Sequence, residues 1–97
     1  KPGEGPTPEA IENGHYHIEL RGIHPSDPSK NMTAHVKGDK DPGYGSTSKM
    51  IVESALALAQ DDLPVEGGFW TPASAMGDAL LSRLPASAGV TFEIESP

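Results

Sequence analysis

The apolar residues of this 97-residue chain first change their spacing at the glycine-rich segment between residues 38 and 47. Before this segment apolar and polar residues alternate, which is typical of half-buried β-strands. After it apolar residues recur every three or four positions, which is typical of an amphipathic helix. A chain that carries both periods in succession is predicted to combine strands and helices in one fold.

Three segments alternate, at residues 15–23, 31–37 and 90–95. The first two are joined by turn-forming residues at 24–30, so they predict an antiparallel hairpin. Nine apolar residues are expected on the inner face of the sheet: Tyr16, Ile18, Leu20, Met32, Ala34, Val36, Val90, Phe92 and Ile94.

Two helices are predicted between the second and third strands. The first begins at Ser46 or Thr47, either of which can cap it, and ends near Gln60. The second begins with Thr71 as N-cap and Pro72 at its first position, and it ends near Pro85. The order is therefore β-β-α-α-β. We predict an α+β fold with a small antiparallel or mixed sheet and two helices on one face.

Residues 1–14 hold three prolines and three glycines, so we expect an extended or flexible lead-in, in which residues 8–12 can form one helical turn. Residues 15–97 are expected to form a single α+β domain. Because the chain opens at Lys1 and runs directly into a Pro-Gly stretch, we expect it to be a fragment of a larger parent.

Composition narrows the function classes. The formal charge is −7 with no basic stripe, which argues against a nucleic-acid partner. The absence of cysteine excludes disulfides and thiolate metal sites, and a small secreted domain would more often carry disulfides. No apolar run reaches the roughly 18 residues that a membrane span needs. We therefore expect a cytoplasmic protein without a transmembrane segment.

The sharpest candidate site is the predicted helix start. Glycines at 43 and 45 would let a ligand approach the free amides of a helix N-terminus, which attract anions. The side-chain hydroxyls at positions 46, 47 and 48 and the ammonium group of Lys49 follow these glycines in the sequence. The predicted substrate-binding residues here are Tyr44, Gly45, Ser46, Thr47 and Lys49. The alternative is a tight strand-to-helix turn that needs glycine for positive φ. The segment matches neither a Walker loop nor a dinucleotide fingerprint.

Trp70 is the sixth predicted contact residue. It follows Phe69 just before the second helix, where it can wall a pocket or anchor an interface. The equally weighted alternative is a hydrophobic staple onto that helix.

Three histidines, His15, His17 and His35, fall on the predicted polar face of the hairpin. Imidazoles at positions i and i+2 of one strand and a third imidazole on the paired strand can point to the same side of the sheet. Such a group of three is a possible metal site. Exposed histidines without a metal are the commoner outcome for such a strand, so we predict no metal ligand.

Several motifs together resemble a known family. They are Asp-Pro-Gly-Tyr-Gly-Ser-Thr-Ser-Lys-Met at 41–50, Glu-Ser-Ala-Leu-Ala-Leu-Ala at 53–59, and Gly-Gly-Phe-Trp-Thr-Pro-Ala-Ser-Ala-Met-Gly-Asp-Ala-Leu at 67–80. The combination resembles the C-terminal end of saccharopine dehydrogenase-like oxidoreductases, in the branch that includes trans-acting enoyl reductases. Residues 89–93, at the start of the final predicted strand, also resemble the C-terminal strand of these proteins.

The resemblance implies a parent with an N-terminal Rossmann domain for NAD(P) and this later region on the substrate side. We therefore expect a C-terminal substrate-side or oligomerisation domain with no catalytic residue and no bound cofactor of its own. Its expected partners are the parent Rossmann domain and, as an open alternative, a second copy in a homodimer. Whether the chain counts as an enzyme stays open, and alone it is expected to be inactive. The alternative function is a free-standing small-anion-binding or protein-interaction module.

Overall fold

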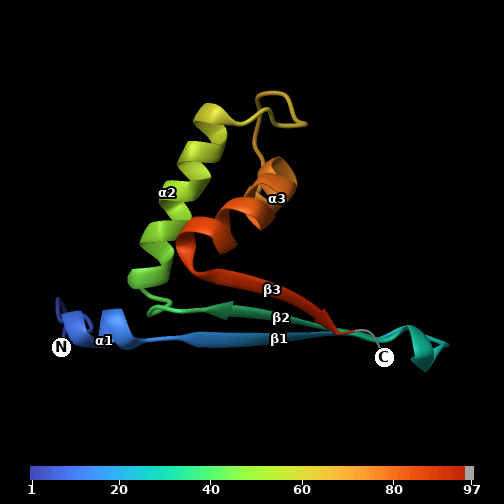
Figure 1. Cartoon of the computed structure of the whole chain (residues 1–97), viewed down its shortest axis with the longest axis horizontal. Coiled ribbons are helices and arrows are strands. Elements are labelled where there is room, and N and C mark those ends of the chain that lie inside the picture. The colour runs from blue at the N-terminus through green and yellow to red at the C-terminus, as the bar shows by residue number, and fades with distance from the viewer. Residues whose placement is uncertain (96–97) are drawn as a thin grey trace.

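The computed structural model describes residues 1–95 and contains a three-stranded sheet with helices on one side (Figure 1). The residues at 96 and 97, which the domain prediction included, lie outside the described part. The elements in chain order are α1 (Pro8–Asn13), β1 (Tyr16–Gly22), η1 (Pro28–Lys30), β2 (Met32–Gly38), α2 (Gly45–Gln60), α3 (Pro72–Arg83), η2 (Leu84–Ala88) and β3 (Val90–Glu95).

The sheet has the order β1-β2-β3, and both pairs are antiparallel. Ile18 pairs with Val36, which pairs in turn with Phe92, so these three residues form one apolar row across the sheet. The next row on the same face contains Leu20 and Ile94. The α+β class and the β-β-α-α-β order of the main elements are thus confirmed, with α1 as an addition at the start.

The lead-in contains the helical turn that its sequence allows. Thr7 caps α1 by accepting a hydrogen bond from the Ala10 amide. The turn is held to the rest of the chain, because Lys40 Nζ donates to Glu12 Oε1 over 2.6 Å. The division between lead-in and domain stays a prediction.

The helix boundaries agree with the sequence except at two ends. As predicted, α2 ends at Gln60, and α3 starts at Pro72 with Thr71 as its cap. The start of α2 is one residue early, at Gly45. Beyond Arg83 the helical path continues through a π-helical turn, η2, past the predicted end near Pro85. It stops at Gly89, whose φ of 66° is the left-handed conformation that favours glycine.

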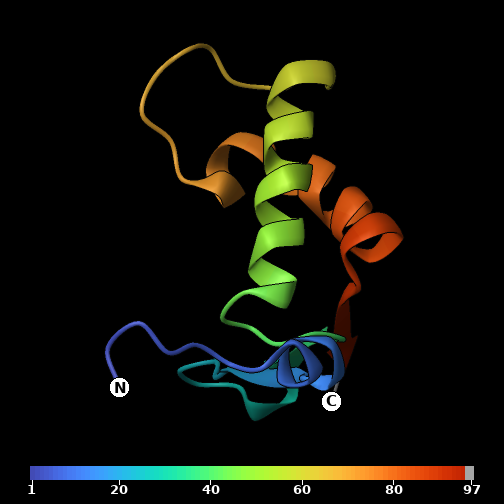
Figure 2. The same ribbon diagram turned by 90° about the vertical axis from the view of Figure 1, so that its left-hand side faces the viewer.

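Both helices stand over one end of the sheet, and the β1–β2 hairpin projects beyond them (Figure 1). Seen along the sheet, α2 rises away from it with α3 beside α2 (Figure 2). The core is correspondingly small. One cluster joins Ala57 of α2 to Met76 of α3, and a second joins Leu84 and Ala88 of η2 to Val90 of β3. The outer half of the apolar sheet face therefore receives no helix from the described residues.

Candidate functional site

An apolar groove runs between α2, α3 and the sheet. Its lining includes Met50 and Ile51 of α2, Leu80 and Leu81 of α3, and Phe92 of β3, and its volume is 560 Å³. Nearly all of this wall is hydrocarbon. A groove with such a lining suits an apolar ligand or an apolar segment of protein.

The groove continues onto the sheet. A second hollow of 570 Å³ lies over Ile18 and Val36 and shares Met50, Leu84 and Phe92 with the first. The two hollows therefore form one apolar path, which leads from the start of α3 to the exposed half of the sheet.

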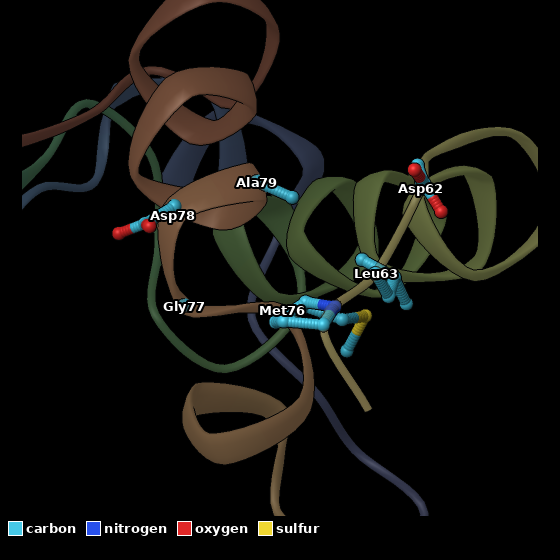
Figure 3. A pocket seen from close by; sticks show the side chains of 7 residues that line it. Asp62, Leu63, Met76, Gly77, Asp78 and Ala79 are labelled. Carbon is cyan, nitrogen blue, oxygen red and sulfur yellow. The ribbon is translucent and has the colours of Figure 1, made fainter. Parts of the chain in front are cut away.

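A third hollow, of 380 Å³, lies between the loop after α2 and the middle of α3 (Figure 3). Leu63 and Met76 lie next to each other in it, whereas the carboxylates of Asp62 and Asp78 point away from each other (Figure 3). Carboxylates in this arrangement are not a pair for general acid and base catalysis, which must converge on one reacting group.

The predicted helix start is held by a carboxylate that the sequence analysis did not select. Asp41 accepts hydrogen bonds from the amides of Gly43, Tyr44 and Gly45, at 3.2, 2.7 and 3.1 Å. The prediction that Ser46 or Thr47 caps this helix is therefore wrong. These amide hydrogen bonds, led by that of Tyr44, hold the pKa of Asp41 below its ordinary value.

The glycines of this turn serve close packing. Positive φ values among the described residues belong to Gly3 and Gly89, so the expectation of positive φ at residues 43 and 45 is wrong. A Cβ on Gly45 would lie 3.1 Å from atoms of Ile11 and Lys40. Glycine at this position lets the start of α2 approach α1.

Ser46 is fully buried, and its Oγ lies 2.9 Å from the Tyr16 hydroxyl. The Tyr16 ring crosses Gly38, where an added Cβ would lie 2.1 Å from a ring carbon. Ser46 therefore joins the first turn of α2 to the first residue of β1, and its hydroxyl is occupied within the fold.

The other predicted contact residues are spread over different surfaces. Thr47 lines the apolar groove, and its hydroxyl donates to the Pro42 carbonyl. Tyr44 is exposed, and Lys49 lies on another side of α2, beside Val52. Trp70 is half exposed in the connection to α3, where its Nε1 donates to the Glu66 carbonyl. Their contact with a ligand stays a prediction.

Two of the three histidines meet on the outer face of the sheet. His17 Nε2 and His35 Nδ1 lie 2.9 Å apart, and His35 Nε2 lies 3.6 Å from Glu95. His15 precedes β1 and does not join them in a ligand set, since residues 1–95 contain no group of three side chains placed to hold a metal.

An ion cluster joins the two long helices. Arg83 donates through Nε and Nη2 to Asp61, both at 2.7 Å, and through Nη1 to Glu53 at 3.2 Å. The guanidinium holds the pKa of Asp61 below its ordinary value. The sequence analysis did not select Arg83. The spacing within one helix gives no signal for a partner on another helix.

The fold and groove thus define a small α+β unit with an open apolar surface. Its sequence is similar to a candidate trans-acting enoyl reductase of Mycobacterium tuberculosis, with 46% identity over 95 residues, which are 96% of this chain and 22% of the relative. Proteins named trans-acting enoyl reductase from Mycobacterium ulcerans and Mycobacterium bovis are 42% identical over 88% and 95% of the chain, and it covers 20% and 22% of them.

The chain therefore spans about a fifth of the length of the curated relatives it matches. No protein-family model and no solved structure matches it. No helix within residues 1–95 is long and apolar enough to cross a membrane.

Proposed function

We propose that this chain is the substrate-side region of a larger NAD(P)-dependent oxidoreductase of the enoyl reductase type. The observation that carries the placement in a larger protein is the open shape of the chain, and the enzyme type is suggested by the names of its relatives. Its accessible surface is 7072 Å², whereas a compact protein of 10.2 kDa exposes about 5,300 Å². Its radius of gyration is 16.3 Å, against about 12.5 Å for a compact chain of this length.

A surface that is roughly a third too large is expected of a region cut from a larger body. The similarity to relatives about five times longer supports the same proposal. The motifs at 41–50 and 67–80 favour a parent with the saccharopine dehydrogenase-like design. In that design a Rossmann domain in another part of the parent protein is the direct partner of this region.

We place the NAD(P) site outside this chain, because the described residues do not fit a dinucleotide. A pyrophosphate needs free amides at a helix start that follows a glycine fingerprint. The amides of Tyr44 and Gly45 are already bonded to the Asp41 carboxylate, whose charge would also repel a phosphate. The same geometry weakens the alternative of a small-anion-binding module. A cytoplasmic location remains part of the proposal.

The substrate role rests on the apolar groove. The relatives' name refers to an enoyl group, which is an unsaturated acyl chain, and acyl chains are apolar. Leu80, Leu81 and Phe92 would give such a chain a hydrocarbon wall. Of the predicted contact residues, Thr47 lies in this groove. The oligomerisation role is the second form of the proposal.

The test uses an exchange protein, in which this chain replaces the matching segment of the 42% identical trans-acting enoyl reductase of M. tuberculosis. Leu81→Trp partly fills the groove, whereas Val52→Trp is a matched change on the other side of α2. NADPH oxidation with an enoyl thioester should show a raised KM for Leu81→Trp and an unchanged KM for Val52→Trp. Equal KM values for the two variants would contradict the substrate role.

A further inference from the structure

Large apolar side chains remain exposed on the half of the sheet that the helices leave open. We call this surface the distal apolar face. It consists of Ile18, Leu20, Met32 and Ile94, with exposed fractions of 51%, 50%, 48% and 67%, and it borders Phe92, which lines the groove. The register of the strands places these four residues and Phe92 on one side of the sheet.

The two sides of the sheet differ completely in charge. The rows of the distal apolar face carry no ionisable side chain, and the small residues between them are Gly22, Ala34 and Val36. The opposite side carries charged residues, with Lys37 bonded to Glu93 at 2.7 Å. A contiguous uncharged face of this kind is typical of a surface that another part of a protein covers.

We propose that the distal apolar face is the docking site of an amphipathic helix from the part of the longer protein outside these 97 residues. This inference rests on the proposed function only in placing the chain within a longer protein. The relatives support that placement, because nearly four-fifths of their length lies outside the matched region.

The dimensions of the face fit one helix. Strands lie about 4.8 Å apart, so three strands present a face about 10 Å across between the outer strand axes. An α-helix with its side chains is about 10 Å in diameter. Because α2 and α3 already cover the inner end of the same face, a further helix would continue their layer along the sheet (Figure 1).

Two other occupants fit less well. A second copy would bring its own α2 and α3, which stand on the very face that would have to pack, and it would add another charge of −7. An extended strand would pair with the free edges of β1 or β3 through its backbone, and it would leave the apolar face open.

Site-specific photocrosslinking in the exchange protein tests the proposal. Leu20→p-benzoylphenylalanine places the crosslinker on the distal apolar face, and Glu19→p-benzoylphenylalanine is the matched control on the opposite face of the same strand. We expect Leu20 to crosslink within one molecule to a single segment outside residues 1–97. Peptide mapping should show that the apolar residues of this segment recur every three or four positions.

Four results would overturn the proposal. They are a crosslinked dimer, a crosslink to a segment with alternating apolar residues, a yield no higher than that of the Glu19 control, and an exchange protein that is unfolded by circular dichroism. The last result counts because the rest of the exchange protein would then have provided no helix that packs on the distal apolar face. Reductase activity is measured on the same sample, so a failure of the proposed function appears separately from a failure of docking.

Discussion

The hydroxyls of Tyr16 and Ser46 meet at 2.9 Å and join the sheet to the first turn of α2. Ser46 is fully buried, so its hydroxyl has no access to water as a substitute partner. The contact becomes possible because Gly38 leaves room for the tyrosine ring. This pair therefore joins two elements whose residues lie 30 positions apart in the sequence.

Tyr16→Phe should lower the free energy of unfolding by about 1–3 kcal/mol, because it leaves the buried Ser46 hydroxyl without a partner. Urea unfolding of the exchange protein measures the change. Tyr44→Phe removes an exposed hydroxyl and serves as the control. If both variants lose the same stability, the Tyr16–Ser46 bond does not have the role assigned to it.

Gly38→Ala should be destabilising by about 1–3 kcal/mol, the usual cost of overpacking. The new Cβ would lie 2.1 Å from the Tyr16 ring, so the ring must move and its bond to Ser46 is lost. Gly67→Ala is the control, because a Cβ there meets no atom within 4 Å. Thermal unfolding should separate the two variants clearly, and similar midpoints would contradict the packing described here.

Asp41→Asn should reduce stability most at neutral pH. Hydrogen bonds from the amides of Tyr44, Gly45 and Gly43 depress the pKa of Asp41 in the folded state. The stability that comes from this shift is present above the ordinary pKa of aspartate and is lost as the pH falls through the lower folded value. The difference between wild type and Asp41→Asn should therefore shrink from pH 7 toward pH 3.

Urea unfolding at several pH values measures this difference. Asp62→Asn, an exposed carboxylate in the loop after α2, controls for the loss of one charge. A difference between wild type and Asp41→Asn that stays constant over this range would show that the Asp41 charge does not hold the helix start.

Arg83→Lys should raise the pKa of Asp61 and weaken the contact between α2 and α3. Arginine makes two bonds to the Asp61 carboxylate at 2.7 Å, and lysine cannot reproduce this fork. Carboxyl chemical shifts followed by NMR over a pH titration report the pKa directly. The pKa of Asp27, which Ser29 and Lys30 hold low, should not move. An unchanged Asp61 pKa would contradict the assigned role of Arg83.

The regular elements could be predicted because their signals are local. Alternation identified the strands, and the Thr71-Pro72 pair identified the start of α3. The cap of α2 was missed because Asp41 lies several residues before the helix and reaches its amides through a turn. A choice between Asp41, Ser46 and Thr47 depends on the path of the turn, which the residue types alone do not specify.

The groove and the exposed face could not be predicted for a different reason. Alternation shows which side of β1 is apolar, but it does not show whether the cover lies in the same 97 residues. Leu20 and Val90 have the same pattern in sequence, yet Leu20 is 50% exposed and Val90 is 1% exposed. The difference arises from the position of α2, α3 and η2 over one end of the sheet.

Segment exchange tests most directly whether this chain is a working region of an enoyl reductase. The trans-acting enoyl reductase of M. tuberculosis would be compared with a version that lacks the matching segment and a version that carries this chain in its place. NADPH-dependent reduction of an enoyl thioester is the readout. We predict that deletion abolishes turnover and that this chain restores it. An exchange protein that is folded but no more active than the deletion would contradict the account.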